Sequence, residues 1–225
     1  MPELIKTESA LGVRSLVSIY KSHVMEKSRK RKLEHFYSLS EWNSSVLDVG
    51  VTGYFDYNSQ VNLFLSNFRY QSQYYTGLAV EPINQLEKAY PDKNFVQYEG
   101  RVFPFPHKSF DWVFSNAVIE HVGDFKSQVL FVNEMVRVSK NVFFTTPNKF
   151  FPIESHTNVA FRHWFSKGFY DWCESNHSYY NESNLNLLSY WRLKQILEMS
   201  NAEHYKIYCN RTLGLTMTFT VVIHS

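Results

Sequence analysis

Residues 44–56, SSVLDVGVTGYFD, place an apolar run directly before two closely spaced glycines. Val46–Val49 is predicted to be a buried strand, because short apolar runs bounded by turn residues are typical of strands. Gly50 and Gly53 permit backbone angles that a Cβ would forbid and let the chain approach a ligand. The three-glycine spacing of a pyrophosphate-binding loop is absent from this stretch. The stretch therefore predicts a strand that runs into a ligand-binding loop, without naming the ligand.

Outward from this stretch, apolar runs alternate with segments of helical period. Helices are predicted over Asp124–Ser139, with Asp124 as N-cap, and over Tyr190–Ser200. The alternation is typical of an α/β fold with a Rossmann-like, mostly parallel sheet and helices on both faces. The short link Asn210–Leu215 favours an antiparallel hairpin, so we expect seven strands with the last one antiparallel. Further strands are predicted at Gly77–Val80, Phe95–Tyr98, Trp112–Phe114, Val142–Thr145, Tyr205–Tyr208 and Thr216–Ile223.

Composition limits the class of protein. The 225 residues are 44% hydrophobic and 17% aromatic, which is enough for one good core with an appended element. The formal net charge of +2 does not require a nucleic-acid partner. Cys173 and Cys209 are too few and too isolated for a disulfide framework or a CxxC metal site. No signal peptide and no apolar run of roughly 20 residues are visible, so we expect a cytoplasmic protein without a transmembrane segment.

The chain is expected to divide into an N-terminal helical segment, residues 1–41, and a main domain, residues 42–225. The first segment should contain helices at about Ser9–Ser22 and Glu26–Tyr37, and it carries the basic run KSRKRK at Lys27–Lys32. This run could bind phosphate, but a solvated helix face is favoured because no aromatic residues interrupt it. Residues of about 147–189 are rich in aromatic, His and Asn side chains and show no long helical period. We expect them to form an insertion that caps the carboxyl edge of the sheet.

Acids and small polar residues follow several of the predicted strands. In an open parallel sheet, ligands bind beyond the carboxyl ends of the strands, where the strand order reverses. Glu81 is placed to accept hydrogen bonds from a ribose diol, and Glu99 from an adenine amino group. The segment SNAVIEH, residues 115–121, follows the fourth predicted strand. These strand ends together predict a site for a nucleoside-like ligand.

The run VFPFPHKSFDWVFSNAVIEHV, residues 102–122, carries a family resemblance. It resembles the signature of class I S-adenosylmethionine-dependent methyltransferases of the type 11 group, whose usual form is close to LPFPDNSFDVVVSSEVLEHV. The resemblance is strongest to a subgroup with DVGVT in the first loop, a PNxxFPxExHT segment and a late NLNLL. It covers roughly residues 42–215 and implies the Rossmann-like methyltransferase fold with S-adenosyl-L-methionine as cofactor. Matching stretches are LDVGVTG at 47–53, GLAVEP at 77–82, NEMVRVSKNVFFTTPNKFFPIESHT at 133–157 and NLNLLSYWRLKQIL at 184–197.

The resemblance also implies which residues hold the cofactor. The first loop would surround the methionine moiety, Glu81 the ribose and Glu99 the adenine edge. The loop is one residue shorter than the common DVGCGTG form, and Glu99 stands where Asp is usual. S-adenosylmethionine has a sulfonium and no phosphate, so carbonyls, an acid and aromatic faces suit it better than an anion-binding loop. The expected cofactor-binding residues are Asp48, Gly50, Val51, Gly53, Glu81, Glu99, Gly100, Arg101, Asn116, Ala117 and His121.

Methyl transfer to an alcohol requires a base that takes its proton. In PIESHT, residues 152–157, His156 is the candidate base and Glu154 the carboxylate that orients it. His156 could instead merely shape its own loop, and His163 is a second candidate that is more typical of packing. Together with Glu154 these histidines match no standard zinc spacing, so no metal is expected. The candidate acceptor-binding residues are His163, Arg162, Trp164 and Asn184.

Three functions remain open at this point. The leading hypothesis is O-methylation of a saccharide or other small-molecule hydroxyl, because proteins similar to this subgroup are associated with cell-surface polysaccharide synthesis; secondary-metabolite synthesis is a related possibility. An RNA-directed methyltransferase that uses Lys27–Lys32 is the alternative, although no motif for base methylation is present. A non-catalytic cofactor-binding homologue is the third. The sequence leaves the oligomeric state open.

Overall fold

A computed structural model describes residues 24–53 and 62–224 of the chain. The chain divides into two units, Met1–Leu39 and Ser40–Ser225. In the first unit, residues 24–39 form a helix that includes the basic run Lys27–Lys32. Within this helix Lys30 Nζ lies 2.6 Å from Glu26 Oε1. The helix predicted at Ser9–Ser22 lies outside the described residues.

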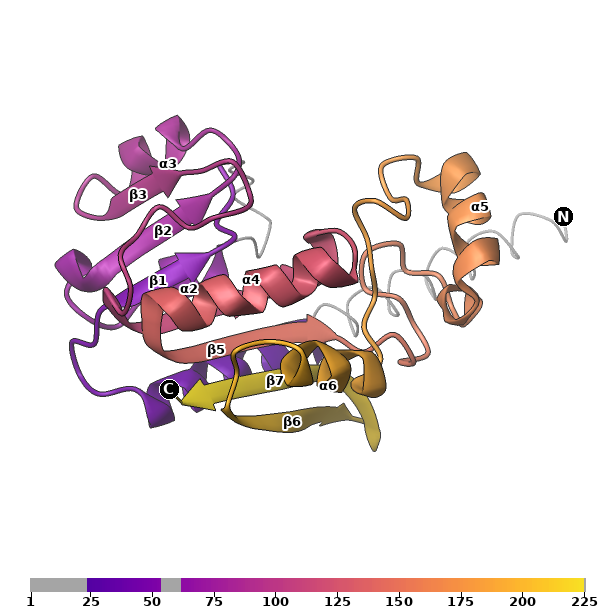
Figure 1. The fold of residues 1–225 in the computed structure, drawn as a ribbon. Helices are drawn as coiled ribbons and strands as arrows, with labels where there is room; N and C mark the ends of the chain where they lie inside the picture. The colour runs from indigo at the N-terminus through magenta and orange to yellow at the C-terminus, as the bar shows by residue number, and fades with distance from the viewer. Residues whose placement is uncertain (1–23, 54–61, 225) are drawn as a thin grey trace, which may run out of the picture. The chain divides into compact units, whose positions relative to one another are not determined.

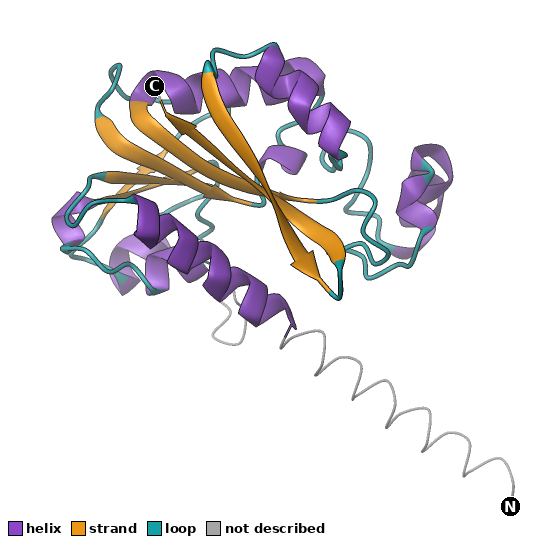
Figure 2. Ribbon diagram, turned by 90° about the horizontal axis from the view of Figure 1, so that it is seen from below, coloured by secondary structure: helices purple, strands orange, loops and turns teal. Residues whose placement is uncertain are grey.

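Strands of the second unit form one sheet with the order β3-β2-β1-β4-β5-β7-β6 (Figure 1). β1 to β5 run parallel to one another, and β7 is antiparallel to both of its neighbours. Among the described residues the sheet therefore has seven strands with only β7 reversed, which confirms the predicted fold class. Figure 2 shows the twist of the sheet from one edge to the other. The strands are β1 Val46–Val49, β2 Tyr75–Ala79, β3 Asn94–Gln97, β4 Phe110–Asn116, β5 Ser139–Pro147, β6 His204–Thr212 and β7 Leu215–His224.

Two of the helices were predicted closely by their apolar period, and the first of them also by its N-cap. α4 begins after Asp124, whose side chain accepts a hydrogen bond from Ser127 N, and it ends before Ser139, where the backbone becomes extended. α6 begins after Ser189, which caps Arg192 N in the same way. The described α-helices of this unit are α2 Leu63–Ser66, α3 Asn84–Ala89, α4 Phe125–Val138, α5 Ser166–Asn176 and α6 Tyr190–Glu198, and short 3-10 turns cover η1 Ser72–Tyr74, η2 Ile119–His121 and η3 Arg162–Trp164.

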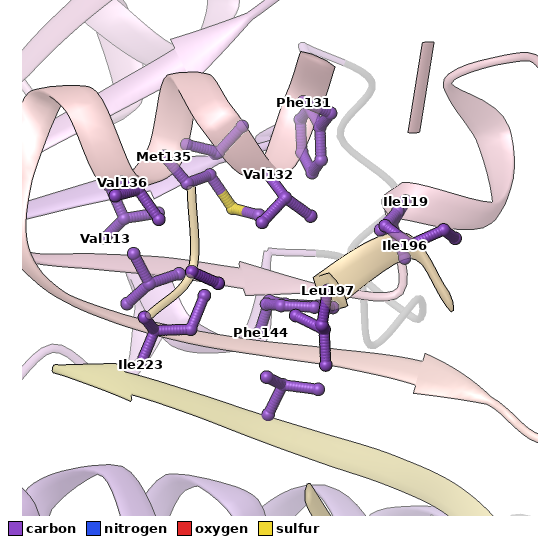
Figure 3. Packing of buried hydrophobic residues seen from close by; sticks show 14 of the residues in the cluster. Val113, Ile119, Phe131, Val132, Met135, Val136, Phe144, Ile196, Leu197 and Ile223 are labelled. Atoms are coloured by element: carbon purple, nitrogen blue, oxygen red, sulfur yellow. The ribbon is translucent and has the colours of Figure 1, made fainter. Parts of the chain in front are cut away.

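The main core lies between the sheet and the pair α4 and α6. Val132 and Met135 of α4, Ile196 and Leu197 of α6 and Phe144 of β5 are all almost completely buried in it (Figure 3). Each such side chain contributes about 1.5–3 kcal/mol through the removal of apolar surface from water. This layer fixes β4 and β5, and therefore the loops that follow them.

The opposite face of the sheet carries an aromatic layer. Phe64 of α2 stacks on Phe114 of β4 with ring centroids 3.9 Å apart, and Phe114 stacks on Phe143 of β5 at 5.6 Å. Tyr75 packs beside Phe64 and donates a hydrogen bond to Asp48 Oδ2 at 2.7 Å. Asp48 is therefore held in a buried layer beneath its strand.

Residues between β5 and α6 form a compact structure beyond the carboxyl end of β5 (Figure 1). Its two ends are tied together, because Asn148 forms a parallel bridge with Leu188. The expectation that this region lacks a long helix is wrong, since it contains α5, Ser166–Asn176. Only Phe169 and Cys173 of α5 are buried, so the helix has too few apolar positions to show a clear period in the sequence.

The last two strands form the predicted hairpin. Leu213 and Gly214 connect β6 and β7, and both have positive φ, 51° and 81°. Two successive positive φ values suit the right-handed twist of a two-residue hairpin turn. In the part of the chain that the structure describes, no helix combines the length and the apolarity needed to cross a membrane.

Candidate functional site

The loop after β1 is packed too closely for side chains at its glycines. Gly50 has φ +95°, and a Cβ there would lie 2.3 Å from Val118 Cγ2. A Cβ at Gly53 would lie 2.1 Å from the carbonyl oxygen of Pro82. Gly50 N also donates to Leu78 O at 2.9 Å. The first loop thus lies against the end of β2 and against the segment after β4, where the strand order reverses.

Glu81 lies at the end of β2 and is connected to the first loop. Thr52 Oγ1 donates to Glu81 Oε2 at 2.5 Å, and Val51 beside it is buried. Asn62 holds the loop backbone, because its side chain accepts from Thr52 N and donates to Thr52 O. The structure therefore brings the first loop and Glu81 together, as expected of two groups that hold one ligand.

The end of β3 lies beside the end of β2. Tyr98 N donates to Ala79 O at 2.9 Å, and the Gln97 side chain donates to Val80 O. The next residues are exposed, and Gly100 adopts φ +86°. The exposed residues that the sequence assigned to the adenine side are Glu99, Gly100 and Arg101.

The segment after β4 bends sharply at Ala117, which has φ +57°. Ala117 N donates to Thr145 O at 2.9 Å, and Thr145 Oγ1 donates to Asn116 Oδ1 at 2.8 Å. β5 therefore fixes the position of Asn116 and Ala117 at the same edge as the first loop.

Asp48 differs from the other predicted cofactor residues because its carboxylate is buried. Burial raises the pKa of Asp48 to about 7, and the hydrogen bond from Tyr75 opposes this change. Its side chain thus belongs to the aromatic layer under β1. We infer that Asp48 supports the first loop through this buried hydrogen bond with Tyr75.

His121 and His156 face each other across the carboxyl edge of the sheet. Their Nε2 atoms are 3.0 Å apart, and the rings are nearly perpendicular at 89°. His121 Nδ1 lies 2.8 Å from Asn184 O, and His156 Nδ1 lies 2.7 Å from Glu154 Oε1. His121 belongs to η2 after β4, while His156 follows β5. We call these two residues the histidine pair.

Glu154 is almost fully buried under His156. Its Oε2 accepts hydrogen bonds from His156 N at 2.9 Å and from Thr157 N at 2.6 Å. Burial alone would raise the pKa of Glu154, but the hydrogen bonds and charge of His156, together with the backbone donors, lower it to about 2. The ionised carboxylate therefore contacts the imidazole that the sequence paired with it, and the catalytic role of the two residues stays a prediction.

Glu120 was not among the residues predicted for the site, although it directly precedes His121. Its side chain is completely buried, with an exposure of 0%. Thr146 Oγ1 donates to Oε2 at 3.0 Å, but Oε1 has no hydrogen-bond partner among the described residues. Ligand atoms of Glu120, His121 and His156 lie within 4.8 Å of one another. The sequence did offer one signal for Glu120, since it is an acid next to His121 in the segment that follows β4.

The predicted acceptor-binding residues do not gather around the histidine pair. His163 is buried and its Nε2 lies 2.9 Å from Phe151 O, while burial lowers its pKa. Trp164 Nε1 donates to the same carbonyl at 3.4 Å, and the Arg162 guanidinium lies over Trp172 at 5.8 Å. These residues form part of the packing of the cap.

Asn184 approaches the histidine pair through its backbone. Its carbonyl oxygen faces His121 Nδ1, whereas its side chain donates to Tyr179 O and accepts from Asn181 N. Asn184 is thus a residue that orients His121.

A pocket of about 320 Å³ lies next to Glu120 and the histidine pair. Asn186 connects the pocket to Glu120. It lines the pocket, and its backbone N–H donates to Glu120 O at 2.6 Å. Burial lowers the pKa of Lys149 and of Arg192, and the nearby Asp124 opposes this change in Arg192. No acidic side chain lines the pocket itself. The lining residues are Gln128, Lys149, Phe150, His163, Ser166, Phe169, Tyr170, Asn186, Leu187, Ser189 and Arg192.

Comparisons with known proteins bear on the fold and on the type of domain. A family model for the methyltransferase domain of type 11 matches residues 61–142. None of the curated protein sequences is significantly similar to the chain. A crystal structure of an S-adenosylmethionine-dependent methyltransferase from Mesorhizobium loti is 13% identical, with 85% of this chain and 96% of that chain covered and a TM-score of 0.55.

Two further solved structures are similar to a comparable degree. S-adenosylmethionine-dependent methyltransferases from Methanosarcina mazei and Aquifex aeolicus are each 14% identical, with TM-scores of 0.54 and 0.52. The first match covers 84% of this chain and 94% of that chain, and the second covers 85% and 88%. At these identities the structures support the fold, and the family model supports the type of domain.

Proposed function

We propose that this S-adenosylmethionine-dependent methyltransferase, whose residues 61–142 match the type 11 methyltransferase domain, transfers the methyl group to a hydroxyl group of a saccharide or another small molecule. The observation that carries this proposal is the contact of His156 Nδ1 with the buried carboxylate of Glu154 at 2.7 Å. A carboxylate that orients an imidazole is the usual arrangement for removing a proton from a hydroxyl group. Cell-surface polysaccharide and secondary-metabolite synthesis are the proposed settings.

In the proposed reaction, the acceptor hydroxyl takes the place beside His156 Nε2 that His121 Nε2 otherwise occupies at 3.0 Å. Its proton passes to Nε2 while the oxygen attacks the methyl carbon in line with the carbon–sulfur bond. The new carbon–oxygen bond forms as the carbon–sulfur bond breaks, which leaves neutral S-adenosylhomocysteine. The carboxylate of Glu154 stabilises the positive charge that His156 gains. A base of this kind typically contributes 10²- to 10⁴-fold to the rate.

The cofactor is proposed to lie along the ends of β1, β2, β3 and β4. Glu81 would accept hydrogen bonds from the ribose hydroxyls, and the Gly50 region would contact the methionine moiety. Val118 supports this arrangement, because it touches the Gly50 position and its carbonyl accepts from His121 N at 2.8 Å. The methyl group would therefore be held on the segment that also carries His121. Holding two reactants in line in this way can contribute about 7–11 kcal/mol.

The pocket beside the cluster supports an acceptor that carries an anionic group. Lys149 and Arg192 line it, while Ser166 and Ser189 add hydroxyl groups. Arg192 lies over the ring of Phe125 at 4.1 Å, which fixes its position. Asp124 lies near Arg192, but no acidic side chain lines the pocket itself. Two cations in such a lining suit a phosphate or a carboxylate, as in a nucleotide-sugar, a lipid-linked glycan or a sugar acid.

Product identification tests the acceptor class directly. The full chain is incubated with a small-molecule and glycan extract and with S-adenosylmethionine labelled in its methyl group. We expect the label in a methyl ether of a saccharide or small molecule, identified by mass spectrometry. A parallel incubation contains total RNA, and label that nuclease treatment releases as methylated nucleotides would overturn the proposal in favour of the RNA-directed alternative. An extract that takes up no label with any fraction would support the non-catalytic homologue.

Charge variants test the anionic group once the product is known. Lys149→Met and Arg192→Met should each raise KM for the acceptor by about 10-fold or more and leave kcat much less affected. Lys88→Met, on exposed α3, is the charge-matched control and should leave KM unchanged. An acceptor KM that is the same in all three variants would remove the pocket from the acceptor site.

A further inference from the structure

We propose that Glu120, His121 and His156 form a binding site for one divalent transition-metal ion of the Zn²⁺ type. The metal-binding set differs from the Glu154, His156 and His163 set whose spacing gave no reason to expect a metal. Ligand atoms of the three residues come within 4.8 Å of one another, from η2 and from the loop after β5. The three ligands therefore come from two segments that are distant in the sequence, and no spacing motif predicts them.

The protonation of the histidine pair is fixed by its outer contacts. A backbone carbonyl can only accept a hydrogen bond, so Asn184 O requires a proton on His121 Nδ1. The Glu154 carboxylate likewise accepts from His156 Nδ1. Both Nε2 atoms therefore present lone pairs to each other across 3.0 Å. Two lone pairs at this distance repel unless a positive charge lies with them, either a shared proton or a metal ion.

The environment of Glu120 favours a metal ion over a shared proton. Oε1 is completely buried and has no hydrogen-bond partner among the described residues, while Oε2 accepts from Thr146. A proton shared between His121 and His156 leaves that oxygen unsatisfied. A metal ion would bind both histidines and the Glu120 carboxylate together. Buried charges that bind metals are a recognised way to avoid the cost of burial.

The surrounding contacts also match those of metal ligands. Histidines that bind metals almost always donate their other nitrogen to a carbonyl or a carboxylate, and the ligating carboxylate is itself hydrogen-bonded. Asn184 O, Glu154 and Thr146 provide these contacts to the three proposed ligands.

The spacing of the ligands is close to that of a small ion. Bonds of 2.0–2.1 Å in a tetrahedral site place ligand atoms about 3.3 Å apart, which is near the 3.0 Å between the two nitrogens. The longest separation, 4.8 Å, must shorten by about 1.5 Å, which rotation of side chains can provide. Two imidazoles and one carboxylate favour Zn²⁺, Co²⁺, Fe²⁺ or Mn²⁺ over Mg²⁺, which prefers oxygen ligands.

The role of the ion rests on the proposed function, whereas its binding does not. Three protein ligands would leave a coordination position open, and the acceptor hydroxyl would occupy it. A bound ion would lower the pKa of that hydroxyl as it does for bound water, and the proton would leave to bulk water. His156 would then be a ligand, and the metal would replace it as the group that activates the oxygen.

Metal binding is measured on the full chain after dialysis against a chelator. Zn²⁺ and Co²⁺ are titrated separately in competition with a chromophoric chelator, and Mg²⁺ serves as the comparison ion. We expect one equivalent of Zn²⁺ or Co²⁺ to bind, with much weaker binding of Mg²⁺, and we expect the bound ion to raise the melting temperature. Glu120→Gln and His121→Ala should each weaken Zn²⁺ binding at least about 10-fold. His107→Ala, at an exposed histidine outside the cluster, should bind Zn²⁺ as the unchanged chain does.

Two results would overturn the inference. One is the absence of saturable binding of one equivalent, which would leave a shared proton between the histidines. The other is unchanged Zn²⁺ affinity in both Glu120→Gln and His121→Ala, which would place the ion elsewhere, for example at exposed Cys209. A far-ultraviolet circular dichroism spectrum that matches the unchanged chain confirms that each variant has folded.

Activity after chelation separates the inference from the proposed function. If the metal activates the acceptor, transfer to the identified hydroxyl product is lost with the chelator and returns with Zn²⁺ or Co²⁺. Transfer that continues in the chelated protein would overturn the metal role but leave the hydroxyl acceptor in place. Metal binding together with a product that is not a methyl ether would overturn the proposed acceptor and keep the site.

Discussion

His121 Nε2 and His156 Nε2 lie 3.0 Å apart, although 35 positions separate the two residues in the chain. The contact exists because β4 and β5 are adjacent and parallel, so the segments that follow them emerge at the same edge of the sheet. Val118 connects this contact to the first loop, since it packs against Gly50 and its carbonyl accepts from His121 N. The cofactor edge and the histidine pair are thus parts of one continuous structure.

Glu81→Ala should weaken the binding of S-adenosylmethionine by at least about 10-fold. A carboxylate that accepts from ribose hydroxyls typically contributes about 1.5–3 kcal/mol per hydrogen bond. Isothermal titration calorimetry of the full chain measures the effect. Glu87→Ala, which removes an exposed acid of α3, is the matched control and should bind normally. Equal affinity in the two variants would exclude Glu81 from the cofactor site.

Gly50→Ala should destabilise the protein by about 2–5 kcal/mol, from a positive φ that disfavours alanine and from a Cβ that meets Val118. Gly168→Ala is the control, because no heavy atom lies within 4 Å of its added Cβ and alanine favours α5 by about 1 kcal/mol. Urea unfolding compares the two variants. If both lost the same stability, the close approach of the first loop to Val118 would be contradicted.

Asp48 should make the protein less stable as the pH rises from about 4 to about 8. Its pKa is raised to about 7 in the folded protein, so the folded state holds the proton more tightly than the unfolded state does. The stability that this proton provides is complete below about pH 4 and is lost as the pH rises through 7. The Asp48→Asn side chain does not titrate. As the pH rises over this range, the free energy of unfolding of the variant should therefore increase relative to that of the unchanged chain by up to about 4 kcal/mol. A difference between the two proteins that stays constant with pH would disprove the raised pKa.

Most of the fold could be predicted from the sequence because its signals are local. The apolar run Val46–Val49 and the cap at Asp124 each lie within one element, and the structure confirms both. Helix α5 could not be predicted, because only Phe169 and Cys173 give it a buried face.

The site was harder to predict because its contacts join distant segments. Residues at strand ends, such as Glu81 and His156, could be identified because every parallel strand delivers its carboxyl end to the same edge. His163 also follows β5 and therefore stayed a second candidate, although packing was the preferred interpretation. The structure agrees with that preference, because His163 is buried against Phe151. The importance of Glu120 depends on an oxygen that is left without a partner, which no sequence pattern reveals.

The central claim is that cofactor binding and acceptor activation are separate tasks, the first at the ends of β1 to β4 and the second at the histidine pair. The direct measurement is to compare S-adenosylmethionine affinity and labelled methyl transfer in the unchanged chain and in His156→Ala. We predict nearly equal cofactor affinity, together with a loss of transfer of at least about 100-fold. Near-normal transfer by His156→Ala, or a parallel loss of cofactor affinity, would contradict the account.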